Sequence, residues 1–277
     1  MTIQVIDSFV DAPGGAIFVR QWRAASAAGS PLVLLHDSLG CVELWREFPE
    51  LLARGSNRPV IAYDRLGFGR SAPRADRLSI EFIDDEAERF FPAVRDALRL
   101  ERFSLFGHSV GGAMALRIAA SVQESCEAVI TESAQCFVES RTLAGIRAAQ
   151  RTFEDPEQLR KLAKWHGARA RWVLDAWVET WLSPEFSSWT LEPWLGRVRC
   201  PVLAVHGDRD EFGSEEFPRR IAGGVAGPSQ MVILQDCGHV PHREQREEIL
   251  RLTASFAAGG QAESLSSNYG GDGKGGR

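Results

Sequence analysis

The chain has few cysteines, and their spacing argues against both disulfides and a zinc site. Only five occur in 277 residues, and no two of them form a C-x-x-C pair. Disulfide frameworks and zinc sites use even or clustered cysteines. We therefore expect reduced thiols that act as small core residues in a cytoplasmic protein, at Cys41, Cys126, Cys136, Cys200 and Cys237.

The chain also lacks a basic patch and a long apolar run. Its net charge of -5 comes from interspersed acids and bases, whereas nucleic-acid-binding proteins cluster Lys and Arg to neutralise phosphates. The opening stretch MTIQVIDSFVDAPGG has no positive segment followed by an apolar one, so it does not resemble a signal peptide. We expect a small-molecule substrate and no nucleic-acid or membrane partner. The sequence leaves a homodimer open.

Short apolar runs alternate with segments of helical period along most of the chain. Continuous apolar runs are typical of strands that are buried on both faces. Repeated strand-helix-strand order predicts an α/β fold, with a parallel sheet between two layers of helices. The predicted strands are residues 16–22, 31–36, 59–64, 102–107, 127–132, 201–207 and 229–236. The predicted helices are residues 41–55, 85–100, 110–122, 214–225 and 243–258.

Two segments interrupt this alternation. Residues 137–195 contain helical patterns without a convincing strand and hold six of the eight tryptophans, which predicts an inserted helical cap, or lid. The core would then comprise residues 1–136 and 196–258. Residues 259–277 are rich in Gly and Ser and nearly free of apolar side chains, a composition that predicts disorder.

A serine lies where one predicted strand ends and a helix begins. Gly107, Ser109 and Gly111 form the pattern G-x-S-x-G within SLFGHSVGGAMAL. A sharp strand-to-helix turn needs small neighbours, and it lifts the serine hydroxyl above the sheet beside the positive end of a helix. This context favours a nucleophilic serine over a glycine-rich packing contact.

A base and an orienting carboxylate follow the last two predicted strands. His239 lies in CGHVPHRE and Asp210 in HGDRDEFG. The order serine, aspartate, histidine is the one used by the α/β-hydrolase fold. Asp208 and Glu132 are the alternative carboxylates, and His242 is the alternative base.

The chain resembles the α/β-hydrolase superfamily, in its lidded branch of small-molecule esterases and carbon-carbon bond hydrolases. The likeness covers nearly all of residues 3–257 and rests on LLHDSLG, YDRLGFGRS, GHSVGG, HGDRDEFG and CGHVPHRE in that order. It implies a mostly parallel, eight-stranded sheet flanked by helices, with an inserted cap. No cofactor is expected, because DRLGFGRS lacks the third glycine and the helix of a dinucleotide-binding fingerprint.

The resemblance also implies an oxyanion hole, and here the chain departs from the family. One donor would be the amide of Val110 and the second the amide of Ser38, with Leu39 or Asp37 as alternatives. Most relatives read His-Gly after the third strand, whereas this chain reads HD. A carboxylate would oppose an oxyanion, so we expect Asp37 to point away and to cap the helix that starts near Cys41. The alternative is that it holds a water or contacts a polar group of the substrate.

The cap is the segment that bears on substrate choice. Its tryptophans recur at helical spacing, which fits the cap's own core as well as a pocket lining. The candidate pocket residues are His108, Leu39, Trp165, His166, Trp181 and Val240.

The sequence therefore predicts a serine hydrolase that cleaves a small, largely apolar ester or thioester through an acyl-enzyme. A carbon-carbon bond hydrolase of the meta-cleavage type would use the same triad. A ligand receptor and a cofactor-free oxygenase or perhydrolase on the same scaffold are further alternatives.

Overall fold

The computed structural model describes residues 2–74 and 76–257, so the tail predicted at 259–277 lies outside the described residues. Eight strands form one sheet in the order β1-β2-β4-β3-β5-β6-β7-β8, which confirms the predicted α/β fold. Strands β3 to β8 run parallel, and only β1 and β2 run antiparallel to their neighbours. The strands are β1 (Ile3–Ala12), β2 (Gly15–Ala24), β3 (Leu32–Leu35), β4 (Val60–Tyr63), β5 (Phe103–His108), β6 (Cys126–Glu132), β7 (Val202–Gly207) and β8 (Ser229–Leu234).

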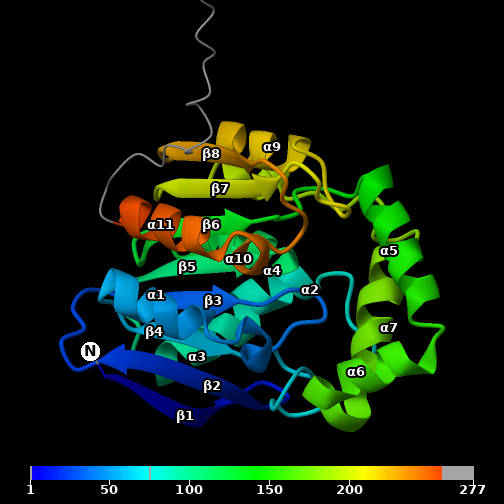
Figure 1. Ribbon diagram of the computed structural model, residues 1–277, viewed down its shortest axis with the longest axis horizontal. Helices are drawn as coiled ribbons and strands as arrows, with labels where there is room; N and C mark the ends of the chain where they lie inside the picture. Colours follow the sequence, from blue (N-terminus) through cyan, green and yellow to red (C-terminus); the bar gives the residue numbers. More distant parts are fainter. Residues whose placement is uncertain (1, 75, 258–277) are drawn as a thin grey trace, which may run out of the picture.

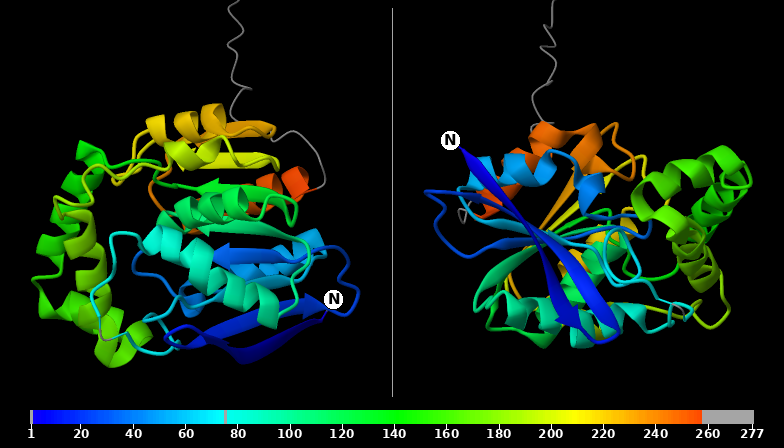
Figure 2. Two further views of the ribbon diagram at one scale, coloured as in Figure 1. Left: turned by 180° about the vertical axis from the view of Figure 1, so that it is seen from behind. Right: turned by 90° about the horizontal axis from the view of Figure 1, so that it is seen from below.

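Helices cover both faces of the sheet, which explains why the central strands are continuous apolar runs. Helices α1 (Phe48–Ser56) and α11 (Arg246–Ala257) pack on one face. Helices α3 (Phe91–Ala97), α4 (Val110–Ser121) and α9 (Glu216–Gly224) pack on the other, and Figure 2 shows the two layers from below and behind. Every residue of β3, β4, β5 and β7 is buried as a result.

Strand β1 is the element that the apolar runs did not reveal. It pairs with β2 along its whole length, from Ile3 opposite Ala24 to Ala12 opposite Gly15. Most of its residues are exposed or half-buried, so it forms the outer strand of an edge hairpin rather than part of the buried sheet. A strand of this kind carries a weak sequence signal, because burial rather than intrinsic preference produces the apolar run.

Three of the predicted helices are interrupted: the segment 243–258 breaks at Gln245, and in the other two a proline follows the interruption. The segment 41–55 forms a 3₁₀ turn at Val42–Trp45, a residue of positive φ at Arg46 and then α1. The helix predicted at 85–100 begins earlier, at Phe82, and comprises α2 (Phe82–Asp85), a π-helical turn at Glu86–Phe90 and α3. Proline is tolerated in the first turn of a helix, where its missing N–H has no partner to lose. Both α1 and α3 begin one residue before a proline for this reason.

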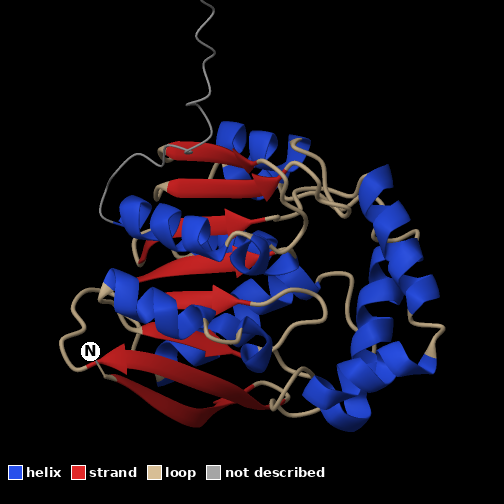
Figure 3. Ribbon diagram, in the orientation of Figure 1, coloured by secondary structure: helices blue, strands red, loops and turns tan. Residues whose placement is uncertain are grey.

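The cap lies between β6 and β7, beyond the carboxyl ends of the parallel strands (Figure 1). Its helices are α5 (Ser140–Thr152), α6 (Pro156–His166) and α7 (Ala170–Trp181), and Figure 3 shows them as a separate layer across from the sheet. A bridge between Phe137 and Thr190 joins the two ends of the segment. Helix α8 (Glu192–Leu195) returns to pack on α4 and α9, and the short α10 (Pro241–Glu244) precedes α11.

Within residues 2–74 and 76–257, no helix combines the length and the apolar character needed to cross a bilayer. All five cysteines are buried and free.

The turn between β5 and α4 leaves no room for side chains at two glycines. A Cβ atom on Gly107 would lie 2.2 Å from the carbonyl oxygen of Gly111, and one on Gly111 would lie 2.2 Å from that of Leu35. Helix α4 thus starts in direct backbone contact with β5 and β3. This contact sets the position of the residue between the glycines, Ser109.

Replacing Gly111 with alanine should destabilise the protein by at least about 2 kcal/mol, because overpacking of a tight contact typically costs about 1–3 kcal/mol or more. Urea denaturation measures the change. Gly223→Ala in α9 is the matched control, since nothing lies within 4 Å of an added Cβ there. It should leave stability unchanged or raise it by up to about 1 kcal/mol. Equal stabilities of the two variants would contradict the packing argument.

Candidate active site

Ser109 occupies the tight turn at the carboxyl end of β5. Its backbone has φ 56° and ψ -128°, a conformation that non-glycine residues rarely adopt. The Ser109 N–H donates to the carbonyl oxygen of Glu132 at the end of β6, with 2.9 Å between the heavy atoms. Val110 then opens α4, and the first N–H groups of a helix have no acceptor within it. The serine therefore stands beside free amide donors at the positive end of a helix.

The three predicted triad residues lie in one line of hydrogen bonds. Ser109 Oγ is 3.0 Å from His239 Nε2. His239 Nδ1 is 2.9 Å and 2.8 Å from the two carboxylate oxygens of Asp210. Asp210 Oδ1 also accepts the backbone N–H of Phe212 at 2.7 Å. The three side chains come from β5, the loop after β7 and the loop after β8, which meet because parallel strands end at the same edge of the sheet.

The pKa shifts of His239 and Asp210 suit the roles of general base and orienting carboxylate. Burial by itself would lower the pKa of His239, but its hydrogen bond to Asp210 and the negative charge of that carboxylate raise it above 6.5. The charges of Asp37 and Glu211 add to this rise. Burial would raise the pKa of Asp210, yet the bond to His239 and the nearby histidines lower it. Asp210 therefore stays ionised beside an imidazole that accepts a proton readily.

The alternative carboxylates and the alternative base are engaged elsewhere. Asp208 Oδ1 accepts the backbone N–H of Cys237 at 3.2 Å, so it joins the loop after β7 to the loop after β8. Glu132 Oε2 accepts the backbone N–H of His242 at 3.1 Å, and Glu132 Oε1 is hydrogen-bonded to His242 Nδ1. Neither Glu132 nor His242 borders the cavity that contains Ser109.

Glu132, His242 and His108 form a buried cluster beneath the triad. Burial raises the pKa of Glu132 to about 7 and lowers that of His242 to about 3, so His242 is neutral and Glu132 takes up a proton below about pH 7. His108 Nε2 donates to the carbonyl oxygen of His239 at 2.8 Å. The prediction that His108 lines the pocket is wrong, because its ring lies under His239 and supports that residue's backbone.

The same cluster has the spacing of a metal site. One ligand atom from each of His108, Glu132 and His242 lies within 4.8 Å of the others. The carboxylate oxygens of Glu132 are both hydrogen-bonded to His242, and His108 Nε2 is bonded to a carbonyl. A proton between Glu132 Oε1 and His242 Nδ1, together with the bond of His108 to a carbonyl, therefore explains why these three side chains lie close together.

Ser38 and Leu39 occupy the centre of a turn that faces the serine. The Gly40 N–H closes the turn by donating to the Asp37 carbonyl oxygen at 3.3 Å, and Arg65 Nη2 donates to the same oxygen at 2.7 Å. Ser38 and Leu39 both line the cavity that contains Ser109. The choice of Ser38 as the second oxyanion donor stays a prediction.

Asp37 does not cap the turn that starts at Val42, contrary to expectation. The Val42 N–H donates instead to Asp64 Oδ1 at 2.6 Å. Asp37 Oδ1 is buried and has no hydrogen-bond partner among residues 2–74 and 76–257, and Asp37 Oδ2 lies 3.6 Å from His108 Nδ1. Asp37 is among the residues that line the cavity, and the expected direction of its carboxylate stays a prediction.

The cavity above Ser109 has a volume of about 180 Å³ and a largely apolar lining. Of the predicted pocket residues, Leu39, Trp181 and Val240 line it. Six further lining residues did not emerge from the sequence: Gln135, Thr142, Ile146, Trp177, Glu211 and Phe212. Gln135 had a detectable signal, because it follows the carboxyl end of the strand beside the nucleophile, where ligands bind in parallel sheets.

Gln135 contacts the serine directly. Its side chain is buried, and its amide lies against Ser109 Oγ, with Nε2 at 3.2 Å and Oε1 at 3.3 Å. When Nε2 is the donor, the serine hydroxyl can donate to His239 Nε2. Gln135 then helps to fix the hydroxyl in the orientation that deprotonation requires.

Two predicted pocket residues lie outside the cavity. Trp165, in α6, is 37% exposed and is not among the lining residues. His166 is buried, but both of its ring nitrogens bind backbone atoms of core loops. The predictions for these two residues are wrong, because α6 lies at the edge of the cap and α5 and α7 provide the cap residues that line the cavity.

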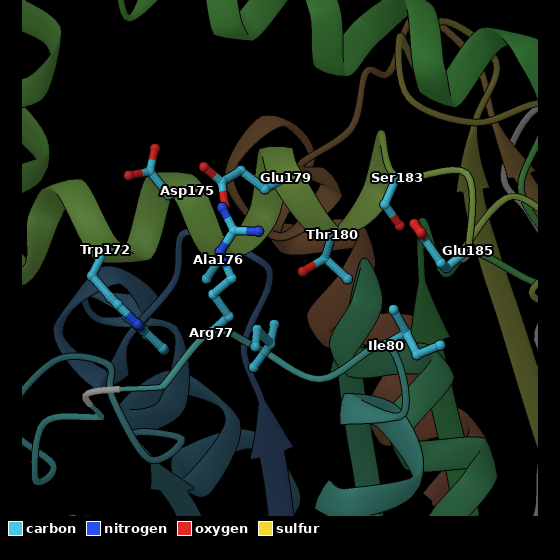
Figure 4. A pocket seen from close by; sticks show the side chains of 10 residues that line it. Arg77, Ile80, Trp172, Asp175, Ala176, Glu179, Thr180, Ser183 and Glu185 are labelled. Atoms are coloured by element: carbon cyan, nitrogen blue, oxygen red, sulfur yellow. The ribbon is translucent and has the colours of Figure 1, made fainter.

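A larger cavity of about 460 Å³ lies between α7 and the loop around Arg77 (Figure 4). Its rim is charged, and Arg77 reaches across to Glu179 with 2.9 Å between the charged atoms. Neither Ser109 nor His239 borders it. We therefore place the site at the smaller cavity.

Comparison with known proteins agrees with this geometry. The sequence model of the alpha/beta hydrolase family matches residues 32–252. The 2-hydroxymuconate semialdehyde hydrolase of Pseudomonas sp. (strain CF600) is 28% identical over 269 residues, which cover 87% of this chain and 91% of that protein. A solved structure of a membrane phospholipase A superposes with a TM-score of 0.75 at 22% identity, with 92% of this chain and 86% of that chain covered. At this identity the likeness concerns the fold alone.

One further similarity is partial. The 1-acylglycerol-3-phosphate O-acyltransferase ABHD5 of Rattus norvegicus is 38% identical over 104 residues, which are 37% of this chain and 28% of that protein. The chain thus matches less than a third of the length of this curated relative.

Glu132→Gln should remove a pH dependence of stability. Because burial raises the pKa of Glu132 from 4.5 to about 7, its stabilising contribution is complete below about pH 4.5 and is lost as the pH rises through about 7. Glutamine can keep both hydrogen bonds to His242 without titrating. The melting temperature of the variant relative to the wild type should therefore rise across this window. A constant difference between about pH 4.5 and 8 would show that Glu132 keeps one charge state.

Proposed function

Since the chain belongs to the alpha/beta hydrolase family, we propose that it is a serine hydrolase of small, largely apolar carboxylic esters or thioesters. The observation that carries the proposal is the hydrogen-bonded line from Asp210 through His239 to Ser109, which opens on an apolar cavity. A buried serine paired with an oriented imidazole is the arrangement that nucleophilic catalysis needs.

The reaction would proceed in two halves. His239 Nε2 takes the proton of Ser109 Oγ as that oxygen attacks the carbonyl carbon, and Asp210 stabilises the resulting imidazolium. The amides of Val110 and Ser38 donate to the oxyanion. The leaving alcohol or thiol departs with the proton from His239, which leaves an acyl group on Ser109. Water then repeats the sequence and releases the acid.

The cavity limits the size of the acyl group. A dry cavity of about 150 Å³ accommodates benzene, and this one has a volume of about 180 Å³. Trp177, Trp181 and Phe212 provide its aromatic walls. We therefore expect acetyl to benzoyl groups to fit and an octanoyl chain to exceed the space.

The charges at the cavity favour a neutral substrate. Asp37 and Glu211 border it, and its lining among the described residues includes neither Lys nor Arg. A carboxylate on the substrate would be held near two negative charges without a cationic partner, which is unfavourable. A neutral ester meets no such cost.

Carbon-carbon bond cleavage is the second candidate, and one observation favours it. The relative of 28% identity that spans most of both chains is a 2-hydroxymuconate semialdehyde hydrolase. The same serine, histidine and aspartate could serve that reaction, so substrate tests separate the two.

Burst kinetics with p-nitrophenyl acetate, benzoate and octanoate test the proposal. The wild type should release a burst of nitrophenol, with octanoate the poorest substrate. Ser109→Ala should lower turnover by at least about a thousandfold, because the acyl-enzyme can no longer form. Ser187→Ala, a change at an exposed serine of the cap, is the matched control and should keep full activity.

The other outcomes are informative. If no ester is cleaved but a fluorophosphonate labels Ser109, the nucleophile is active and carbon-carbon cleavage becomes the leading candidate. Absence of both turnover and labelling would overturn the serine-hydrolase proposal, and a ligand receptor or a cofactor-free oxygenase or perhydrolase would take its place.

The activity should fall as the pH decreases through the pKa of His239, because the protonated imidazole cannot accept the serine proton. This pKa is raised above 6.5, so kcat/KM should decline about tenfold per pH unit below that midpoint. Asp37→Asn should move the midpoint to lower pH, since the charge of Asp37 raises the pKa of His239. Glu185→Gln, at the other cavity, should leave it unchanged. Coincident profiles of wild type and Asp37→Asn would contradict the assignment.

A further inference from the structure

One side chain of the cap binds two separate loops of the core. His166 ends α6 and is only 1% exposed. Its Nδ1 accepts the backbone N–H of Gly69 at 3.0 Å. Its Nε2 lies 3.0 Å from the carbonyl oxygen of Leu39. An amide N–H only donates and a carbonyl only accepts, so the ring is neutral with its proton on Nε2.

The contact with Leu39 falls on the turn that holds the oxyanion donors. The carbonyl of Leu39 shares a peptide plane with the N–H of Gly40, and that N–H closes the turn on the Asp37 carbonyl. The Asp37 carbonyl is held from the core by Arg65. The turn is thus fixed at its first carbonyl by the core and at its last by the cap.

We propose that His166 is a positioning residue that couples the docked cap to the oxyanion hole. Its hydrogen bond to Leu39 holds the peptide plane at the end of the turn, and thereby the direction of the Ser38 and Leu39 N–H groups. This inference rests on the proposed hydrolase function. Activity would then require the cap to be docked on the core, because the cap positions the oxyanion donors in addition to enclosing the substrate.

The surroundings of His166 fix the position of its imidazole ring and keep the ring neutral. Its ring packs edge-on against Phe68, with 6.1 Å between the ring centroids. Burial lowers the pKa of His166 below 6.5, and the bond to the Leu39 carbonyl and the charge of Asp37 only partly oppose this. Protonation of Nδ1 would place a hydrogen against the Gly69 N–H, so the neutral ring is the form that fits.

Arg169 provides a matched comparison for His166. It attaches the same corner of the cap to the core but does not contact the turn of residues 37–40, which we call the oxyanion turn. Its guanidinium donates to the carbonyl oxygens of Gly69 and Ser71. A change at Arg169 should loosen the cap and lower the melting temperature. It should not act on the Leu39 peptide plane.

Two substitutions of His166 separate its two hydrogen bonds. In His166→Asn the amide oxygen can take the place of Nδ1 and accept from Gly69, but nothing donates to Leu39. In His166→Gln the amide nitrogen can take the place of Nε2 and donate to Leu39, but the Gly69 N–H loses its acceptor. Both variants lose the ring, so a difference between them reports on the Leu39 bond.

The experiment compares pre-steady-state kinetics of p-nitrophenyl acetate for wild type, His166→Asn, His166→Gln and Arg169→Met, below the melting temperature of each. Loss of one oxyanion donor typically costs about a hundred- to a thousandfold, and a misplaced donor costs less. We expect the acylation rate of His166→Asn to fall about 10- to 100-fold with KM changed less than about threefold. His166→Gln should recover most of that loss, and Arg169→Met should keep the wild-type rate.

Equal losses in His166→Asn and His166→Gln, or a comparable loss in Arg169→Met, would overturn the inference and leave His166 with a structural role alone. So would changes confined to KM or to the melting temperature. If the wild type itself shows no burst and no fluorophosphonate labelling, the proposed function fails instead. The two failures are therefore distinguishable.

Discussion

The backbone of Ser109 is the constraint on which the site depends. A non-glycine residue at φ 56° and ψ -128° costs of order 1–3 kcal/mol and persists only where the surroundings enforce it. Here the Ser109 N–H is bonded to the end of β6, and Gly107 and Gly111 let α4 start in contact with β5 and β3. The packing of the sheet therefore holds the hydroxyl above its edge, within reach of His239.

The histidines show how one residue type acquires different properties from its surroundings. Burial dominates at five of the six and lowers the pKa of His36, His108, His166, His206 and His242. Only His239 has a raised pKa, because the Asp210 carboxylate 2.8 Å from its Nδ1 outweighs the cost of burial. The neutral histidines bind backbone atoms or Glu132 as structural partners. The difference lies in the carboxylate: the pKa of Asp210 is lowered and its charge supports His239, whereas burial raises the pKa of Glu132, the partner of His242, to about 7.

The cap contributes to the geometry of the site as well as to its walls. In α5, Arg141 donates to the carbonyl oxygens of Asp210 and Gly213, and Thr142 donates to that of Phe212 at 2.6 Å. The loop that carries Asp210 is therefore held by the cap, and His166 holds the oxyanion turn in the same way. The inserted segment therefore both lines the cavity above Ser109 and binds the loop that carries Asp210.

The sequence by itself determined the α/β sheet and the three residues of the proposed triad, because strand burial and sharp turns have local signatures and because parallel strands bring their carboxyl ends to one edge. The partners of Glu132, His108, Asp37 and His166 were decided only by the tertiary structure. The contact of His166 with Leu39 spans 127 positions of the chain, and that of His242 with Glu132 spans 110. Such contacts leave no local pattern, since a buried polar side chain takes whichever donor or acceptor the packed core brings within reach.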